Sequence, residues 1–396
     1  MPQSADRQDP AGQPYLVVGT SVRGLVQSAK AAGHAVIAMD AFGDVDTRQS
    51  AGAFEPLPLH GLRVNGVELV RRVRNLGARR PLAGLVYGSG LETQVSALQA
   101  LTELLPVFGN APSVFAAAQS PEQLRRWLAG SPVRFPETRT ARPADSEAWL
   151  IKPLAGSGGS GIQTASSTTA GPDEVYQRRV RGLSLSAQFL ANGERACVLG
   201  VHQQWCRPDN SEAGSFLHGG AASRPDLPAG LTGLLESLVQ RLTAAAGLRG
   251  LNGVDCVYDG QVLWLLELNA RPCASLDLYD AALPGGLFHW HLRASAGELP
   301  ATAPDPVRRA YQILYADHEL RVPRGLQWPS WATDRPAAGT RIMAGAPVCT
   351  VHGDSGDIES RYAELADRQQ RVLEGLRGDR RPLWRRWLGS EAVATI

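Results

Sequence analysis

The stretch from Leu251 to Asp280 constrains the fold of this 396-residue chain more than any other. Two runs rich in Val, Leu, Tyr and Trp flank Asp259-Gly260, a dipeptide typical of tight turns, and the second run ends at Arg271-Pro272. This pattern predicts a β-hairpin. Three residues with oxygen ligands lie along it, namely Asp255, Glu267 and Asn269.

The turn decides whether these three side chains converge. With a two-residue loop, Asp255 pairs with Trp264 and lies on the opposite face from Glu267 and Asn269. With a three-residue loop, Asp255 pairs with Leu265 and all three polar side chains share one face. We predict this second register, with Gly260 left-handed and a bulge. It also forms an apolar core face from Val254, Cys256, Tyr258, Val262, Trp264, Leu266 and Leu268.

In that register Asp255 and Glu267 are diagonal neighbours, with Cβ atoms about 7 Å apart. Carboxylates placed in this way can bind one or two Mg²⁺ ions together with phosphate oxygens. The alternative is a surface hairpin with solvated carboxylates, which is the usual setting of an isolated Asp or Glu. Three oxygen ligands on one face, followed by Arg271, favour the metal site.

The composition excludes several classes of protein. A formal charge of +2, with no long basic stripe, argues against nucleic acid as a partner. No apolar run approaches the roughly 18 residues of a membrane span, and the polar start is unlike a signal peptide. The five cysteines are scattered without a metal-binding spacing and suit a reducing compartment. We therefore expect a cytoplasmic protein of two or three subdomains, without a membrane or nucleic-acid partner, and a homodimer stays open.

A second strong signal surrounds Lys152. Of the 40 Lys and Arg residues only Lys30 and Lys152 are lysine, and Lys152 ends a predicted strand directly before a glycine-rich loop. The lysine precedes the glycines, so this is not a Walker loop. Backbone N–H groups and hydroxyls of such a loop can still close over phosphates, beside an ammonium on a rigid strand. The alternative is a flexible linker. The retained lysine favours phosphate binding by Gly156, Ser157, Gly158, Gly159, Ser160 and Gly161.

The N-terminal part predicts a parallel sheet. After a tail (1–13) that we expect to be disordered, a strand at 15–19, a helix and a strand at 35–39 form a βαβ unit. A helix at 66–78 and a strand at 84–87 continue this domain to about residue 110. Gly88-Ser89-Gly90 follows the last strand, where backbone N–H groups border a ligand crevice or form a tight turn. Asp40 is placed like a ribose-binding acid, and the alternative is a loop cap.

The remaining chain supplies further strands and helices. A helix begins at Ser120, and a hairpin with a turn at Asn192-Gly193 suits a hinge near 188–193. There Gln188, Phe189 and Leu190 would line an adenine, and Glu194 would meet a ribose. A helix at 231–246 leads into the first hairpin. Beyond residue 300 we expect a small β-rich segment, a helix at 362–376, and a tail that either docks elsewhere or caps the core. His202 and His218 have no ligand spacing and suit the core or the surface.

The order of a lysine strand, a glycine loop, a hinge strand, a helix and Asp…Glu-x-Asn-x-Arg resembles the ATP-grasp superfamily over residues 111–300. Segments 17–47, 84–92, 108–110 and 334–351 resemble a narrower branch. These are the predicted ATP-dependent carboligases related to biotin carboxylase, from tetrahydromethanopterin and methanofuran (C1-cofactor) gene clusters. The chain is also similar to tyramine–glutamate ligases.

The resemblance implies an α/β fold in three parts. A Rossmann-like parallel-sheet domain spans 14–110, a two-subdomain ATP-grasp domain spans 111–300, and a small C-terminal β-rich segment spans 301–396. It implies ATP and one or two Mg²⁺ ions as cofactors. Lys152 and the glycine loop would hold the phosphates, residues 188–190 the adenine and Glu194 the ribose. Asp255, Glu267 and Asn269 would hold Mg²⁺, and Lys152 and Arg271 would be catalytic. One departure is that family members place another lysine where this chain has Arg125 and Arg126.

The implied reaction joins a small-molecule carboxylate and an amine through an acyl phosphate, for instance glutamate with a C1-cofactor precursor. Such chemistry depends on positioning and charge neutralisation and needs no nucleophilic side chain. One alternative is a kinase or carboxylase-like enzyme, and another is a non-catalytic nucleotide-binding regulatory subunit. The candidate acceptor-substrate residues are Gly19, Arg23, Asp40, Gly88, Ser89, Gly90 and Ser275.

Overall fold

The computed structural model of the chain describes residues 12–61, 63–166, 168–207, 216–302 and 304–377. Most of the predicted N-terminal tail and all of the C-terminal tail with Trp384 and Trp387 lie outside these residues. The fold is mixed α/β, as predicted, and three sheets of five, four and eight strands carry it. No helix of the described ranges is long and apolar enough to cross a membrane.

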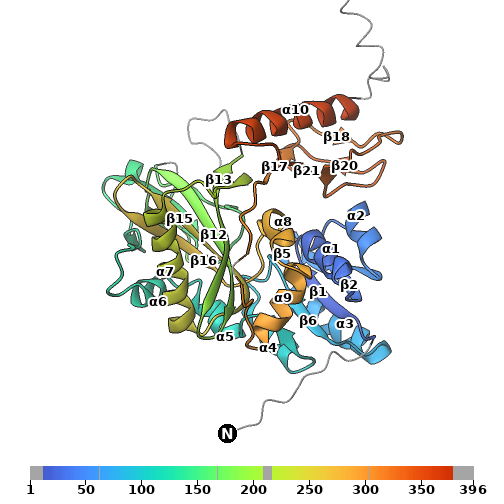
Figure 1. Cartoon of the computed structure of the whole chain (residues 1–396), viewed down its shortest axis with the longest axis horizontal. Coiled ribbons are helices and arrows are strands. Elements are labelled where there is room, and N and C mark those ends of the chain that lie inside the picture. Colours follow the sequence, from blue (N-terminus) through green and yellow to red (C-terminus); the bar gives the residue numbers. More distant parts are fainter. Residues whose placement is uncertain (1–11, 62, 167, 208–215, 303, 378–396) are drawn as a thin grey trace, which may run out of the picture.

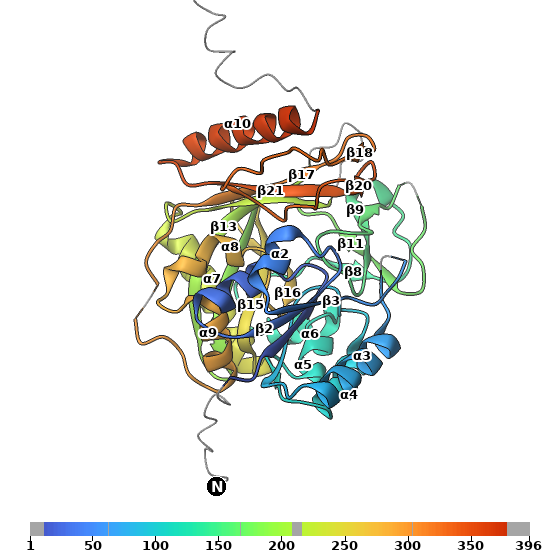
Figure 2. The same cartoon turned by 90° about the vertical axis from the view of Figure 1, so that its right-hand side faces the viewer.

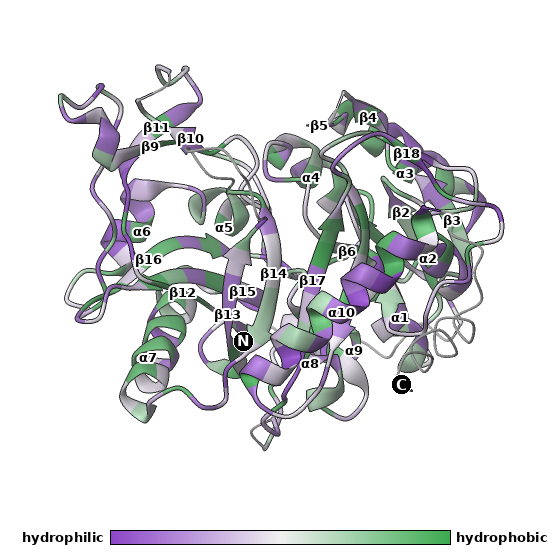
Figure 3. Cartoon of the chain, turned by 90° about the horizontal axis from the view of Figure 1, so that it is seen from above, coloured by the Kyte–Doolittle hydropathy of each residue, from purple (hydrophilic) through white to green (hydrophobic). Residues whose placement is uncertain are grey.

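The five-stranded sheet is parallel and lies in the N-terminal domain. Its central strands are buried along their whole length, because helices or other elements cover both faces, and β6 is largely hydrophobic (Figure 3). The sheet order is β3-β2-β1-β6-β7. Its strands are β1 (Tyr15–Gly19), β2 (Val36–Asp40), β3 (Ala53–Pro56), β6 (Gly84–Tyr87) and β7 (Val107–Phe108); a small hairpin of β4 (Leu59–His60) and β5 (Arg63–Val64) and helices α1 (Arg23–Ala31), α2 (Val45–Ser50), α3 (Gly66–Arg79) and α4 (Val95–Thr102) connect them.

The four-stranded sheet follows two short helices. Ser120 caps the second helix by accepting a hydrogen bond from the N–H of Gln123, which is the predicted cap. The sheet order is β10-β9-β11-β8, and Trp149, Ile151 and Tyr176 form a small core of their own. The elements are α5 (Pro112–Ala117), α6 (Pro121–Trp127), β8 (Thr138–Arg139), η1 (Ser146–Ala148), β9 (Trp149–Pro153), β10 (Gln163–Thr164) and β11 (Glu174–Arg178).

The eight-stranded sheet has the order β16-β15-β12-β13-β14-β17-β21-β19, so the C-terminal strands extend the same sheet as the hairpin. Helix α10 lies across the C-terminal strands (Figures 1 and 2). The elements are β12 (Leu183–Asn192), β13 (Ala196–Cys206), β14 (His218–Ser223), α7 (Ala229–Ala246), β15 (Arg249–Tyr258), β16 (Leu263–Asn269), α8 (Leu276–Tyr279), η2 (Asp280–Ala282), α9 (Gly286–Ser295), β17 (Ala310–Tyr315), β18 (Leu320–Arg321), β19 (Ala332–Thr333), β20 (Arg341–Ile342), β21 (Pro347–Gly353) and α10 (Ile358–Leu376).

The β15–β16 hairpin forms, but its predicted register is wrong. Tyr258 pairs with Leu263 across a longer turn, in which Gly260 has the expected positive φ of 100°. Cys256 then pairs with Leu265 while Asp255 pairs with Glu267, so the irregularity lies inside the ladder and inserts Leu266. The extra residue changes which side chains face the core. Leu263 and Leu265 are buried there, whereas the predicted core residues Trp264 and Leu266 are only half-buried.

Candidate active site

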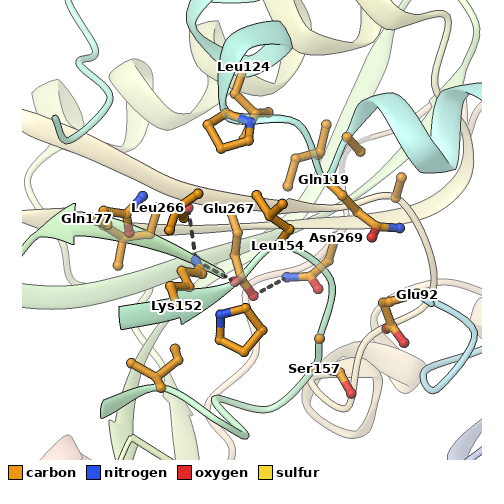
Figure 4. Close-up of a pocket in the computed structure, with 18 of the residues that line it drawn as sticks. Glu92, Gln119, Leu124, Lys152, Leu154, Ser157, Gln177, Leu266, Glu267 and Asn269 are labelled. Atoms are coloured by element: carbon orange, nitrogen blue, oxygen red, sulfur yellow. Dashed lines mark hydrogen bonds and ion pairs between the residues drawn. The ribbon is translucent and has the colours of Figure 1, made fainter. Parts of the chain in front are cut away.

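A cavity lies between the four-stranded and eight-stranded sheets (Figure 4). Strand β9 contributes Lys152, strand β11 contributes Val175 and Gln177, and strand β16 with its following loop contributes residues 266–271. The N-terminal domain adds Glu92. Gln177 and Glu92 lie at opposite ends of this view, with the hairpin carboxylate Glu267 between them. The cavity therefore collects side chains from all three sheets or their loops.

The hairpin brings Asp255, Glu267 and Asn269 to one face, as predicted. Asp255 and Glu267 are direct cross-strand partners rather than diagonal neighbours. The Nδ2 atom of Asn269 donates to Asp255 Oδ2 at 3.0 Å and to Glu267 Oε1 at 3.3 Å. Gln204 Nε2 donates to the other Asp255 oxygen at 3.0 Å. Burial, followed by the neighbouring charge of Glu267, raises the pKa of Asp255, so two ionised carboxylates are unfavourable at this point of the hairpin.

Lys152 reaches the hairpin from the opposite sheet. Its Nζ atom lies 2.9 Å from Glu267 Oε2 and donates to the carbonyl of Leu266 at 3.2 Å. Leu266 is the residue that the bulge inserts, so its carbonyl is available to the ammonium. Burial opposes ionisation of Glu267, yet the charge of Lys152 and the hydrogen bonds from Asp255, Lys152 and Asn269 together outweigh burial and lower the pKa of that carboxyl. Glu267 is thus held ionised beside the lysine.

These residues fit a divalent cation. Two facing carboxylates and a carboxamide are the oxygen donors that Mg²⁺ prefers, and a cation would relieve the repulsion that raises the pKa of Asp255. Within the described ranges, no group of three His, Cys, Asp or Glu side chains could hold a metal. The ligand set would therefore need amide and phosphate oxygens as well as Asp255 and Glu267.

The glycine loop after Lys152 closes one wall of the cavity. Gly156, Ser157, Gly159 and Ser160 line it, and Gly158, Gly159 and Gly161 have positive φ angles of 62°, 75° and 79°. A Cβ on Gly159 would lie 1.8 Å from the carbonyl oxygen of Phe216. The adjacent carbonyl of Gly158 accepts a hydrogen bond of 2.9 Å from the N–H of His218. Glycine is therefore required for the close approach of this loop to the large sheet.

Arg271 lies at the end of the cavity nearest the N-terminal domain. Its Nε atom donates to Glu92 Oε1 at 2.6 Å, and both residues are only 7% exposed. Burial opposes its charge, but the charge and hydrogen bond of Glu92, together with the charges of Cys273 and Glu267, outweigh burial and raise the pKa of the guanidinium. Glu92 was missed as a site residue. Its position two residues beyond Gly90, at the carboxyl edge of a parallel sheet, was the available signal.

The predicted adenine and ribose residues are not in the cavity. Gln188, Phe189 and Leu190 are fully buried in β12, and the neighbouring strands β13 and β15 pair with the backbone of β12 on both sides. The prediction mistook a hairpin turn inside the large sheet for the hinge. The connection between the two antiparallel sheets is residues 179–182, so Val175 and Gln177 on β11 line the cavity instead. Glu194 lies exposed at the β12–β13 turn, where its N–H binds Asn192 Oδ1.

The predicted acceptor residues lie outside this cavity, and several of them have structural contacts. Asp40 accepts hydrogen bonds from the N–H groups of Val22, Phe42 and Gly43, which is the loop-cap alternative. Arg23 is buried against carboxylates of other segments. None of Gly19, Arg23, Asp40, Gly88, Ser89, Gly90 and Ser275 lines this cavity. The glycines allow close packing, because a Cβ on Gly90 would lie 2.1 Å from Thr20 Oγ1 and one on Gly19 would lie 3.1 Å from the carbonyl of Ser89.

The helix before the lysine strand carries Arg125 and Arg126, which stand where members of the resembled family have a lysine. Arg125 donates to the carbonyl of Thr138, and Arg126 pairs with Glu122 on the surface. Neither arginine lines the cavity, whereas Gln119, which precedes the helix, does. The position facing the ligand space is therefore a neutral amide, and Lys152 is the only lysine that lines the cavity.

Comparison with known proteins agrees with this geometry. Residues 122–275 match the profile of the ATP-grasp domain. The carbamoyl phosphate synthase large chain of Streptomyces coelicolor is 25% identical over 270 residues, which cover 62% of this chain but only 23% of that protein. The chain thus corresponds to about a quarter of that relative.

Solved structures share the fold at low sequence identity. The biotin carboxylase domain of Hydrogenobacter thermophilus 2-oxoglutarate carboxylase, solved with MgADP as a dimer, has a TM-score of 0.69 at 13% identity, over 91% of this chain and 89% of that one. The L-amino acid ligase of Bacillus licheniformis gives 0.67 at 13% identity, over 90% and 97%. The N5-carboxyaminoimidazole synthetase of Staphylococcus aureus, solved with ADP, gives 0.65 at 12% identity, over 90% and 97%.

The fold is therefore that of ATP-grasp proteins, and the domain match supports a place in the ATP-grasp superfamily. The solved neighbours with this fold include a biotin carboxylase domain, an L-amino acid ligase and a carboxyaminoimidazole synthetase. The biotin carboxylase neighbour is solved with MgADP and the synthetase neighbour with ADP.

Proposed function

We propose that this protein is an ADP-forming carboxylate–amine ligase that activates its carboxylate as an acyl phosphate. One observation carries this proposal. A single cavity contains Lys152, the glycine loop, the carboxylate Glu267 beside Asp255, and Arg271. These are groups for phosphates, a divalent cation and a transferred phosphoryl group, and no nucleophilic side chain is needed.

The cavity divides into two ends in this proposal. The end with Phe135, Val175, Gln177 and Leu266 is mainly apolar and would take the adenine. Lys152 and the N–H groups of residues 156–161 would neutralise and hold the phosphates. Bound Mg²⁺ would supply charge neutralisation at the phosphoryl oxygens, with Asp255, Glu267 and Asn269 as its protein ligands.

The chemistry would take place at the Arg271 end. The substrate carboxylate attacks the γ-phosphorus of ATP, which forms the acyl phosphate and releases ADP. The amine nitrogen then attacks the acyl carbon, the C–O bond to phosphate breaks, and the amine loses a proton as the amide forms. The residues of this chain position the reactants and neutralise charge during both steps.

The substrates we propose are small molecules. The resemblance of residues 17–47 and 334–351 to C1-cofactor carboligases supports a role in methanofuran or tetrahydromethanopterin assembly, with glutamate as one substrate. We further propose a cytoplasmic location, which the free cysteines among the described residues suit. A dimer would parallel the biotin carboxylase neighbour.

A carboxylase-like reaction is the second candidate. The observation that favours it is the fold shared with a biotin carboxylase domain and with N5-carboxyaminoimidazole synthetase. In that case bicarbonate would be the carboxylate that is phosphorylated. The two candidates use the same cavity and differ only in the acid at the Arg271 end.

The test is ADP release from Mg·ATP against a panel of carboxylates and amines, with bicarbonate included. ADP release that depends on a carboxylate and an amine, with a product of amide mass, would support the ligase. ADP release with bicarbonate alone as the acid would favour the carboxylase-like reaction. Nucleotide binding without turnover on any pair would contradict both and favour a regulatory subunit.

A further inference from the structure

Glu92 stands apart from the other groups of the cavity. Apart from Glu267, it is the only carboxylate among the described residues that line the cavity. It comes from the loop after β6 of the N-terminal sheet, outside the matched ATP-grasp domain of residues 122–275. The site as described is therefore incomplete without a residue from the N-terminal domain.

The contacts of Glu92 fix it on both sides. Its Oε1 atom accepts from Arg271 Nε at 2.6 Å, and its Oε2 atom accepts from the N–H of Gly90 at 2.7 Å. Gly90 has a φ of 99° and a Cβ there would collide with Thr20, so the loop conformation that aims this N–H depends on glycine. The loop at the edge of the parallel sheet thus fixes the carboxylate, and the carboxylate fixes the arginine.

Two of the three nitrogen atoms of the Arg271 guanidinium have hydrogen-bond partners among the described residues. Besides Glu92, its Nη1 atom donates to the carbonyl of Pro272 at 3.1 Å and contacts the sulfur of Cys273. No partner of its Nη2 atom is found in the described part of the chain, and the residue lines the cavity. A guanidinium is planar, so two fixed nitrogen atoms determine where the third one points. Nη2 is the donor that remains for a ligand.

We propose that Glu92 is a positioning residue that aims Arg271 at the anion transferred in the reaction. This rests on the proposed function for the identity of that anion, a phosphoryl group or an acyl phosphate. Since the buried pair is neutral overall, Arg271 selects an anion by direction more than by net charge. Through this ion pair, a residue of the N-terminal domain orients Arg271 for a reaction step that takes place among residues of the ATP-grasp domain.

A different role for Glu92 would be to take the proton from the attacking amine. Both of its oxygen atoms already accept hydrogen bonds, which favours positioning over proton transfer. The two roles differ in a measurable way. A positioning residue acts through Arg271, so its effect disappears when Arg271 is removed, whereas a base acts on the amine regardless of Arg271.

The experiment is a double-mutant cycle in the full chain with Glu92→Ala, Glu92→Gln and Arg271→Met. We expect Glu92→Ala to lower kcat for ADP release about a hundredfold with little change in KM for ATP, because a misplaced donor acts mainly on the transition state. Glu92→Gln keeps one acceptor for Arg271 Nε, so it should lower kcat only about tenfold. In the Arg271→Met background, Glu92→Ala should lower kcat further by less than about threefold.

A second readout needs no turnover. The affinity for inorganic phosphate, measured in the presence of MgADP, should fall on Glu92→Ala in the wild-type background and stay unchanged in the Arg271→Met background. Glu68→Ala is the matched control, since Glu68 is an N-terminal-domain carboxylate paired with Arg71 and Arg72 on the surface. If Glu92→Ala does not fold, Glu92→Gln carries both readouts.

Multiplicative losses in the cycle would overturn the positioning role and indicate a base. Unchanged kcat and phosphate affinity in Glu92→Ala would also overturn it. Failure of the proposed function is recognised separately, because the wild-type protein would then release no ADP with any carboxylate. The phosphate-binding cycle would still decide the role of Glu92.

Discussion

Two buried arginines link the N-terminal domain to the rest of the chain, and they are satisfied to different extents. Arg23 on α1 uses all three nitrogen atoms, on Asp277, Asp334 and Gln27. Arg271 lines the cavity, and only two of its nitrogen atoms, Nε and Nη1, have hydrogen-bond partners among the described residues. Arg23 also lines a separate cleft beneath α10, away from Lys152 and the hairpin carboxylates. A saturated arginine holds domains together, whereas one with a free edge can bind a ligand.

Substitution of a hairpin carboxylate should cause the largest loss of ATP turnover. Glu267→Ala removes one oxygen ligand of the proposed Mg²⁺ site and the partner of Lys152, so ATP turnover should fall at least about a hundredfold. The variant should remain folded, because Glu267 is only half-buried at the cavity wall. Steady-state ADP release and circular dichroism check the two parts. Retained turnover would remove Glu267 from the mechanism.

Arg23→Met should separate stability from chemistry. It leaves Asp277 and Asp334 uncompensated, and breaking a buried ion pair costs about 3 kcal/mol. Urea denaturation should show that loss in the free energy of unfolding, while KM for ATP changes less than about twofold. A large rise in KM for the acceptor substrate would instead restore the acceptor role first predicted for Arg23 and would weaken the contrast with Arg271.

The raised pKa of Asp255 predicts a pH-dependent response to Mg²⁺. Between the usual pKa of an Asp and the raised one, the folded protein binds more protons than the unfolded chain, so without metal this group lowers stability as the pH rises. Mg²⁺ needs the ionised carboxylate and offsets that loss. The rise in Tm on adding Mg²⁺ should therefore be larger at about pH 8 than at about pH 6. An equal shift at both pH values would argue against Asp255 as a ligand.

The smallest effects test the proposed position of the nucleotide base. Gln177 lines the cavity and Glu194 does not. Gln177→Ala should raise KM for ATP several-fold, because roughly one hydrogen bond to the base is lost. Glu194→Ala, on the exposed turn, should leave KM within about twofold. The opposite ranking would restore the hinge near 188–193.

Much of the architecture could be read from sequence because local signals carry it. The strand at Gly84–Tyr87, the cap at Ser120 and the helix ending at Ala246 appear as predicted. The sequence singled out Lys152, the glycines that follow it and the acidic hairpin, and the structure brings Lys152, the glycine loop and Glu267 to one cavity. These features depend on neighbours within a few residues, where composition and periodicity are informative.

The errors arose where the outcome depended on distant parts of the chain. The inserted Leu266 shifts the register of the β15–β16 pair, and no neighbouring Gly or Pro indicates this bulge in the sequence. We predicted Gln188 as a hinge residue because the sequence does not show that β13 and β15 flank its strand. Glu92 and Arg271 are 179 residues apart, and Arg23 and Asp334 are 311 apart, so their pairing follows only from the tertiary fold. Local patterns therefore identified the lysine, the glycine loop and the hairpin carboxylates as candidate site residues, but they did not identify the partner of Arg271.

The central claim is that a substrate carboxylate is phosphorylated in the cavity between the two antiparallel sheets. The most direct measurement follows oxygen-18 from a labelled carboxylate substrate during amide formation with Mg·ATP. The acyl-phosphate route predicts that one labelled oxygen passes into the released phosphate and that Arg271→Met slows this transfer. Amide formation that leaves all of the label out of the phosphate would contradict it.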